Sequence, residues 1–467
     1  MVLQTNRENK IREKINPVFF SVLLAVAVLT AMAITRSSTT LILELTAGLI
    51  ILIISFLSPE AAVYFLIFSM LLSPEIVIAE LPQREISVRM DDMLILIIAF
   101  SWLARNAVYK ELGLFVKTPL NKPVLYYVLA CVLATALGML FGKVKPLQGT
   151  LFVLKYIEYF LIFFMVVGSI QSREQVKRYF IAMIIAALII SIYAIFQIPS
   201  GERISAPFEG KSGEPNTFGG YLVLIISILL GILLSHGSLK VKALSLGAMV
   251  FAAVPLIHTL SRSSWMALAG MYISLMIFSK RVAALTALLV IIILAVPMIM
   301  PEKVEQRYRA TFMTKPVESP QQVKIGDTYL DLSASERINS YMKILEDIKD
   351  RPVFGYGVTG YGFIDGQFFR TLIETGLIGF AAFIYLLYKV FSTTFSVYRN
   401  TGDELFRGIS LGMLAGLGAL TAHALSANTF IIVRIMEPFW LVMGMVVATM
   451  QLSKQPLDSN YTYGNNN

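Results

Sequence analysis

The chain has 467 residues, of which 56% are hydrophobic and only 15% are charged, and its mean hydropathy is +0.71. This composition excludes an ordinary soluble globular protein and predicts a polytopic membrane protein. The formal charge of +9 does not indicate nucleic-acid binding, because the basic residues fall mainly in short connectors between apolar segments. We therefore expect a membrane-embedded protein with no nucleic-acid partner.

About fourteen apolar runs are long enough, at roughly 17 to 25 residues, to cross a bilayer as helices. The sequence thus predicts an all-α, polytopic membrane bundle of about 12–14 transmembrane helices. The expected spans are 17–34, 39–57, 61–79, 91–109, 123–142, 150–170, 179–198, 216–235, 242–260, 264–279, 282–300, 369–393, 406–424 and 429–452.

Lys and Arg residues are concentrated in alternate connectors, as is typical of cytoplasmic loops. With the amino terminus inside the cell, the basic connectors at 105–122, 171–178, 238–242, 279–281 and 398–407 all fall on the cytoplasmic side. The predicted organisation is a cytoplasmic arm at 1–16, transmembrane helices at 17–300, a large periplasmic or extracellular loop at 301–368, three last transmembrane helices at 369–452 and a cytoplasmic tail at 453–467.

The external loop contains the sequence "LSASERINSYMKILEDIKDRP", which predicts an amphipathic helix. Ser333 and Glu336 have the spacing of a capping box, and Pro352 would end the helix. The expected apolar face consists of Ile338, Tyr341, Leu345 and Ile348. A connector this long is uncommon unless it is functional, although a passive solvated loop remains the alternative.

Three arginines are predicted at the external side: Arg203, Arg262 and Arg370. A guanidinium is permanently charged and can form paired hydrogen bonds with phosphate oxygens, so these side chains suit a lipid-linked diphosphate. The alternative for each is that it extends toward lipid headgroups. That alternative is weaker for Arg262, which lies between two apolar segments with almost no connector.

Other polar residues predict neither a metal site nor a cofactor. The chain has three histidines without metal-ligand spacing, and it has no Asp-x-Asp pair of the kind that holds a nucleotide sugar through a metal. Lys155 and Glu158 lie one turn apart within an expected span. We interpret them as a self-neutralised pair, with contact to a sugar as the alternative.

Four motifs occur in one order around the long loop: "PNTFGGYL" (215–222), "SRSSWMAL" (261–268), "RPVFGYGVTGYG" (351–362) and "LIETGLIGF" (372–380). Together they resemble the O-antigen ligase and polymerase superfamily of integral membrane glycosyltransferases. The resemblance implies metal-independent transfer of a glycan from an undecaprenyl-diphosphate carrier at the outer face of the bacterial cytoplasmic membrane. It implies that Arg203 and Arg262 hold the diphosphate, and we add Arg370 to that group.

The resemblance also nominates Asp365. Members that act as lipid A ligases carry a His nine residues before the Glu of a Glu-x-Gly motif, and here that position is Asp365, counted back from Glu374. Asp365 would act as a general base toward the acceptor hydroxyl, or would orient the acceptor sugar. The alternative is that it caps a helix starting near 367. Further candidates for the acceptor cavity are Glu374, Asn216 and Tyr361.

Because the ligase His is replaced, we expect a polymerase that joins lipid-linked oligosaccharide repeat units into an O-antigen, capsule or exopolysaccharide. A ligase acting on lipid A core or another acceptor stays open. A transporter of lipid-linked oligosaccharides or anions is the alternative of another class, although the sequence lacks the internal repeat common in transporters. The expected partners are the lipid-linked substrate, membrane lipid and a chain-length regulator protein.

Overall fold

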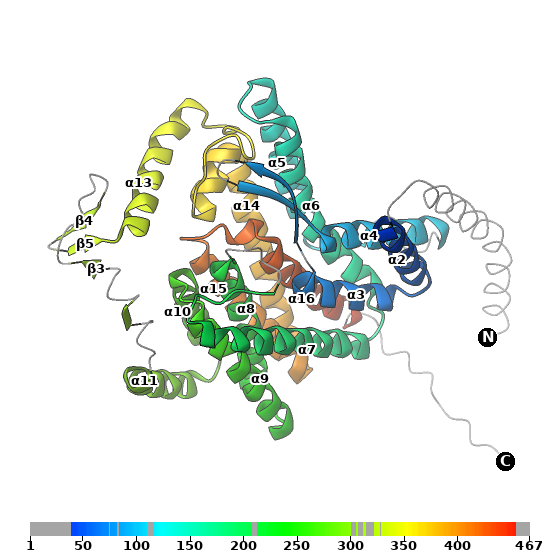
Figure 1. Ribbon diagram of the computed structural model, residues 1–467. Coiled ribbons are helices and arrows are strands. Elements are labelled where there is room, and N and C mark those ends of the chain that lie inside the picture. The colour runs from blue at the N-terminus through cyan, green and yellow to red at the C-terminus, as the bar shows by residue number, and fades with distance from the viewer. Residues whose placement is uncertain are drawn as a thin grey trace, which may run out of the picture.

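The structure is a computed structural model that describes residues 39–453 except 74, 82–83, 110–115, 208–212, 300–304, 307–311, 314–321 and 327. The arm at 1–16, the expected span at 17–34 and the tail after 453 lie outside the described residues. The described part is a bundle of helices, which confirms the predicted all-α class (Figure 1).

Most expected spans correspond closely to helices. Their bounds are α2 Thr39–Leu57, α3 Pro59–Leu72, α4 Met90–Tyr109, α5 Asn121–Leu140, α6 Pro146–Ser169, α7 Arg173–Gln197, α8 Pro215–Ser235, α9 Leu239–His258, α10 Arg262–Phe278, α11 Val282–Ile299, α14 Gln367–Asn400, α15 Glu404–His423 and α16 Val433–Leu452. Among the described residues, eight helices are long and apolar enough to cross a membrane, and they are α5–α9 and α14–α16. The total of 12–14 spans stays a prediction.

The expected span at 61–79 is wrong in its second half. Helix α3 ends at Leu72, and its C-cap residue Ser73 has extended backbone angles (φ −85°, ψ 135°). Ser73 precedes a proline in the sequence, and a residue before proline is disfavoured in the helical region. Two antiparallel strands follow, β1 Glu75–Leu81 and β2 Arg84–Arg89, with Glu75 opposite Arg89 and Leu81 opposite Arg84.

The centre of the bundle is α8, which is buried along most of its length between α9, α10 and α15. Small residues allow the close approach of α8 and α15. A Cβ on Gly412 would lie 2.4 Å from the Cα of Ile228, and one on Gly231 would lie 2.3 Å from the Gly412 nitrogen. Packing of this kind replaces hydrophobic burial as the force between helices in a membrane.

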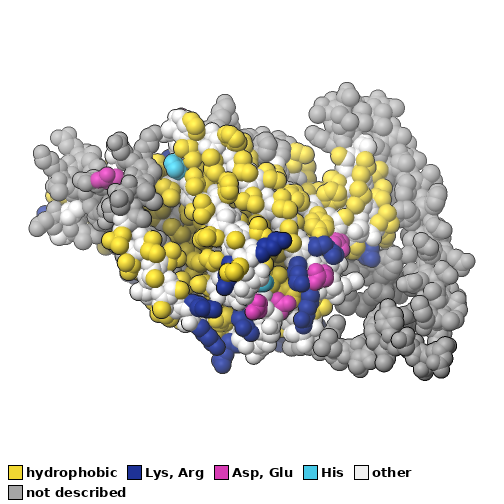
Figure 2. Space-filling model, turned by 90° about the horizontal axis from the view of Figure 1, so that it is seen from below, with side chains coloured by type: hydrophobic (Ala, Val, Ile, Leu, Met, Phe, Trp, Pro, Cys, Tyr) yellow, Lys and Arg dark blue, Asp and Glu magenta, His cyan; other side chains and the backbone are white. Residues whose placement is uncertain are grey.

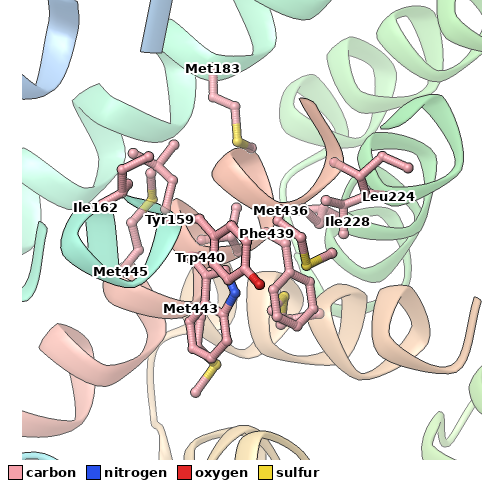
Figure 3. Close-up of a cluster of buried hydrophobic side chains, with 14 of the residues drawn as sticks. Tyr159, Ile162, Met183, Leu224, Ile228, Met436, Phe439, Trp440, Met443 and Met445 are labelled. Atoms are coloured by element: carbon pink, nitrogen blue, oxygen red, sulfur yellow. The ribbon is translucent and has the colours of Figure 1, made fainter. Parts of the chain in front are cut away.

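A second dense region joins α16 to α6 through aromatic side chains (Figure 3). The ring of Trp440 packs edge-on against Phe160 with centroids 4.9 Å apart, and against Phe163 at 5.6 Å. The Tyr159 hydroxyl donates a hydrogen bond to the Phe430 carbonyl oxygen (3.1 Å). This hydrogen bond fixes the start of α16, at the end of the bundle where the candidate site lies.

The segment 351–362 packs into a kink of α14. Gly376 interrupts that helix with φ 65° and ψ −169°, a conformation that favours glycine. The Tyr356 and Leu377 amides donate to the Ile373 and Pro352 carbonyl oxygens (2.9 and 2.8 Å). A Cβ on Gly376 would lie 2.3 Å from the Val353 oxygen, so the close backbone approach requires glycine there.

The predicted amphipathic helix of the long loop is present as α13, Leu332–Asp347, beside the amino-terminal end of α14 (Figure 1). The predicted capping box is wrong, because the N-cap is Asp331, whose side chain accepts from the Ala334 amide. The apolar face also differs by one position. Ile344 is fully buried, whereas Leu345 is 51% exposed. Before α13, short strands β3 (Phe312–Met313), β4 (Lys324–Ile325) and β5 (Thr328–Leu330) pair in the order β3-β5-β4.

Candidate functional site

Arg203 and Asn216 meet at the turn between α9 and α10. The Arg203 side chain donates from Nε to the Thr259 carbonyl oxygen (3.0 Å) and from Nη2 to Asn216 Oδ1 (3.2 Å). The turn itself is held by Ser261, whose hydroxyl caps α10 by accepting from the Ser264 amide. Arg203 is exposed, so these contacts orient a guanidinium that is still accessible to an anion.

Arg262 is the first residue of α10 and faces the long loop. Its Nη1 lies 2.6 Å from Asp331 Oδ2, and the two side chains are 18% and 16% exposed. Arg262 therefore bridges α10 to the N-cap of α13. Because Thr259 is three residues before Arg262, this arginine and Arg203 are both fixed to the same short turn.

Asp365 pairs with Arg337 of α13. Arg337 donates from both Nε and Nη2 to Asp365 Oδ2 (3.2 and 3.1 Å), and the Asp365 side chain is 34% exposed. Asp365 does not cap α14, because the N-cap is Gly366 (φ 109°), with no side-chain hydrogen bond. The capping alternative for Asp365 is therefore wrong. Among the described residues no hydrogen bond engages Oδ1, which can accept one from a substrate.

The backbone that carries Asp365 is held from both sides. On one side, Asn428 Nδ2 donates to the Ile364 carbonyl oxygen (2.6 Å). On the other, the Gln367 amide donates to the Ala424 and Ala427 carbonyl oxygens (2.9 and 3.1 Å). These hydrogen bonds anchor the start of α14 to the connector between α15 and α16. A carboxylate on so constrained a segment can keep a fixed position relative to a substrate.

Helix α13 connects the two charged pairs. Its N-cap Asp331 binds Arg262, and Arg337, six residues later, binds Asp365. At 1.5 Å per residue, the two attachment points are about 9 Å apart along the helix axis. The structure thus brings Arg203, Asn216, Arg262 and Asp365 to one end of the bundle.

Arg370 and Glu374 form a separate, buried pair one helical turn apart on α14. Arg370 Nε donates to Glu374 Oε1 (3.2 Å), and the side chains are only 5% and 3% exposed. The same oxygen accepts from the Thr359 amide (3.0 Å), which fastens the segment 351–362. Arg370 Nη2 is buried without a hydrogen-bond partner in the described part of the chain. Arg370 is therefore buried on α14 and does not form one group with the exposed Arg203 at the α9–α10 turn.

Tyr361 also lies apart from Asp365. Its hydroxyl donates to the Asp347 carboxylate at the end of α13, and its ring packs edge-on against Tyr356 with centroids 5.5 Å apart. Burial, and then the neighbouring Asp347 carboxylate, raise the pKa of Tyr361 above its ordinary value. This tyrosine therefore remains a neutral donor and fixes the loop.

An apolar groove of about 550 Å³ opens near this end of the bundle, between α10, α14 and α15. Its walls contain small residues, and Ile273 and Leu425 at its rim are 58% and 52% exposed. The lining residues are Gly270, Ile273, Ser274, Phe368, Gly418, Thr421, Ala422 and Leu425. Phe368 is three residues after Asp365, so one wall of the groove and this carboxylate both lie at the start of α14.

Within the described residues, no group of three or more His, Cys, Asp or Glu side chains is placed to hold a metal ion. The predicted pair of Lys155 and Glu158 is wrong. Lys155 Nζ instead binds Asp92 Oδ2 (2.8 Å), across from α6 to α4. A bridge between helices replaces the expected pair within one helix, because α4 packs against α6.

Sequence reasoning missed two members of the site, Asp331 and Arg337. A signal was present, since Arg337 belongs to the predicted amphipathic helix and Asp331 directly precedes it. The sequence analysis assigned that helix an apolar face and gave its charged side chains no role. Each of them lies opposite a residue that the motifs had already nominated.

Part of the chain matches a known family. Residues 247–384 match a family model described as O-antigen ligase. The matched segment contains Arg262, Asp365, Arg370 and Glu374, whereas Arg203 lies before it. No curated protein matches the chain. The chain is therefore similar to the O-antigen ligase family over residues 247–384, a segment that contains α10, α11, α13 and the start of α14.

Proposed function

We propose that the chain is a polymerase that joins undecaprenyl-diphosphate-linked repeat units into a surface polysaccharide at the outer face of the cytoplasmic membrane. The observation that carries the proposal is the arrangement at one end of the bundle. Arg203, from the α7–α8 connector, and Arg262 meet at the α9–α10 turn, and α13 connects Arg262 to the Asp365 carboxylate at the start of α14.

The donor lipid fits this arrangement in two parts. Its polyprenyl chain would occupy the apolar groove between α10, α14 and α15 that contains Phe368. Its diphosphate would bind Arg203 and Arg262, because guanidinium groups pair with phosphate oxygens through two hydrogen bonds. Arg262 would then share its charge between the diphosphate and Asp331. Arginines supply the neutralising charge in this proposal, so no metal ion is required.

The transfer would proceed by general base catalysis. The hydroxyl oxygen of the acceptor sugar forms a bond to the anomeric carbon of the donor, while the bond from that carbon to the phosphate oxygen breaks. Asp365 Oδ1 takes the hydroxyl proton, and Arg337 holds the carboxylate through Oδ2. The leaving lipid diphosphate keeps the electron pair, and its charge is stabilised by Arg203 and Arg262.

Polymerase is preferred over ligase because Asp365 stands where ligases of the resembling family carry a His. The deletion strain separates the two activities. A polymerase defect leaves single repeat units on the final acceptor, whereas a ligase defect leaves full-length chains on the lipid carrier. Repeat units retained on the cytoplasmic leaflet would instead indicate transport. Unchanged surface polysaccharide in a deletion strain would contradict the proposal.

A further inference from the structure

A polar cavity, separate from the apolar groove, lies at the opposite ends of the helices from Asp365. Its volume is about 480 Å³. It is formed where α8 ends, where α10 turns into α11, where α14 ends and where α15 begins. The lining residues are Leu234, Ser235, Ser279, Lys280, Arg281, Tyr398, Arg399, Arg407 and Leu411. The distribution of Lys and Arg along the chain predicts that these ends face the cytoplasm.

The lining contains four cations and, among its described residues, no carboxylate. Lys280 and Arg281 come from one connector, and Arg399 and Arg407 flank another. In the described part of the chain, none of the four forms an ion pair. Lys177 and Arg178, which the sequence assigns to the same face, both do, with Glu174 and Glu60.

The nearby acids are engaged elsewhere. Asp403 caps α15 by accepting from the Leu405 and Phe406 amides (2.9 and 3.2 Å). Glu404 accepts from the Gly237 amide (2.8 Å). Figure 2 shows that Lys and Arg side chains, with some Asp and Glu side chains between them, gather on one part of the lower face, beside a broad hydrophobic area. Membrane topology requires basic residues on this side, but it does not require four of them to converge on one cavity.

The cavity is also held in shape. The Tyr398 hydroxyl donates to the Phe278 carbonyl oxygen (2.9 Å), which joins the end of α14 to the end of α10. Arg407 Nη2 donates to the Thr401 carbonyl oxygen (2.9 Å), and this fixes one cation on the wall. Leu234 and Leu411 give the wall an apolar side, so a ligand with both an anion and a hydrocarbon part matches it best.

We propose that this cavity binds the phosphodiester headgroup of an anionic glycerophospholipid of the cytoplasmic leaflet. Unpaired cations between membrane helices attract such headgroups, and the cavity is large enough to hold a glycerophosphate group. Free inorganic phosphate is also an anion, but it has no hydrocarbon part that could contact the apolar wall. The site is independent of the proposed polymerase activity.

The test uses full-length protein purified in a neutral detergent. Its thermal unfolding is followed with short-chain phosphatidylglycerol, with phosphatidylcholine of the same chain length and with inorganic phosphate. The variant Lys280→Gln/Arg281→Gln/Arg399→Gln removes three cations and keeps the bond from Arg407. The matched control Lys177→Gln/Lys240→Gln/Lys242→Gln removes three charges outside the cavity.

Phosphatidylglycerol is expected to raise the unfolding temperature of the parent protein more than phosphatidylcholine does. The cavity variant should bind it roughly tenfold or more weakly, since each cation near a headgroup contributes to affinity. The control should bind as the parent does. If the triple variant is unstable, Arg399→Gln alone should still weaken binding several-fold. Equal phosphatidylglycerol affinity in variant and control would overturn the proposal, as would an equal effect of inorganic phosphate.

Discussion

The two arginine–carboxylate groups near the start of α14 differ in what surrounds them. Arg337 and Asp365 join separate elements, and their side chains are 19% and 34% exposed. Arg370 and Glu374 lie on one helix and are 5% and 3% exposed. A partly exposed pair can exchange a partner for a substrate at little cost, whereas a buried pair cannot lose one member without leaving a desolvated charge. The pair of Arg337 and Asp365 is therefore suited to a catalytic role. The pair of Arg370 and Glu374 is suited to a structural role, in which it holds the segment 351–362.

The largest expected effect is on activity at Asp365. Asp365→Asn should lower polymer elongation by about 10²–10⁴-fold, because an amide cannot accept the proton of the acceptor hydroxyl. The stability should stay near that of the parent, since α14 is capped by Gly366 and not by Asp365. The measurement is elongation of lipid-linked repeat units by purified protein, with thermal unfolding as the control. Near-normal elongation would remove Asp365 from the catalytic role.

The buried pair of Arg370 and Glu374 should show the opposite result, an effect on stability. Arg370→Met should destabilise the protein by about 3–5 kcal/mol, because it leaves the Glu374 carboxylate buried without its cation. The double variant Arg370→Met/Glu374→Met should recover much of that loss. Thermal unfolding in detergent measures both. A stable Arg370→Met protein with reduced donor affinity would instead support a direct contact between Arg370 and the diphosphate.

Substitution of Arg203 or Arg262, which meet at the α9–α10 turn, should have a smaller effect, and it should be confined to binding of the donor. Arg203→Lys and Arg262→Lys keep the charge but lose one of two paired hydrogen bonds. A hydrogen bond to a charged group contributes about 1.5–3 kcal/mol, which corresponds to roughly ten- to hundredfold in donor affinity. Steady-state kinetics with varied lipid-linked donor should show the loss in kcat/KM. If both variants keep the parent value, these arginines do not hold the diphosphate.

The smallest effect is expected at Asp331, which both caps α13 and pairs with Arg262. Two substitutions there separate these two roles. Asp331→Ala should cost about 1 kcal/mol of stability through loss of the α13 cap, whereas Asn caps about as well as Asp. The Asp331→Asn protein should therefore unfold at the same temperature as the parent. Because asparagine carries no charge, it should compete less with the donor diphosphate for Arg262, and the variant should bind the donor more tightly. Thermal unfolding and donor titration of the two variants test this. Lower donor affinity in the Asn variant would mean that Asp331 orients Arg262 instead of competing for it.

Much of the fold follows from local patterns in the chain. Apolar runs with polar ends predicted nearly every described helix, because a membrane helix must satisfy its own backbone hydrogen bonds within one segment. The pattern failed at 73–79, where the largely apolar strand β1 follows α3. Hydropathy alone does not separate a continued helix from such a strand, and the proline after Ser73 was the overlooked indication.

The sequence by itself determined the membrane class, the helix order and the nomination of Arg203, Arg262 and Asp365, since these depend on composition and on short motifs. Only the tertiary structure decided which charges meet. Asp331 and Arg337 are far in sequence from at least one of their partners, and Lys155 was paired across helices with Asp92. Side-chain partners depend on how helices pack, and no local pattern encodes the distance between elements separated by a long loop.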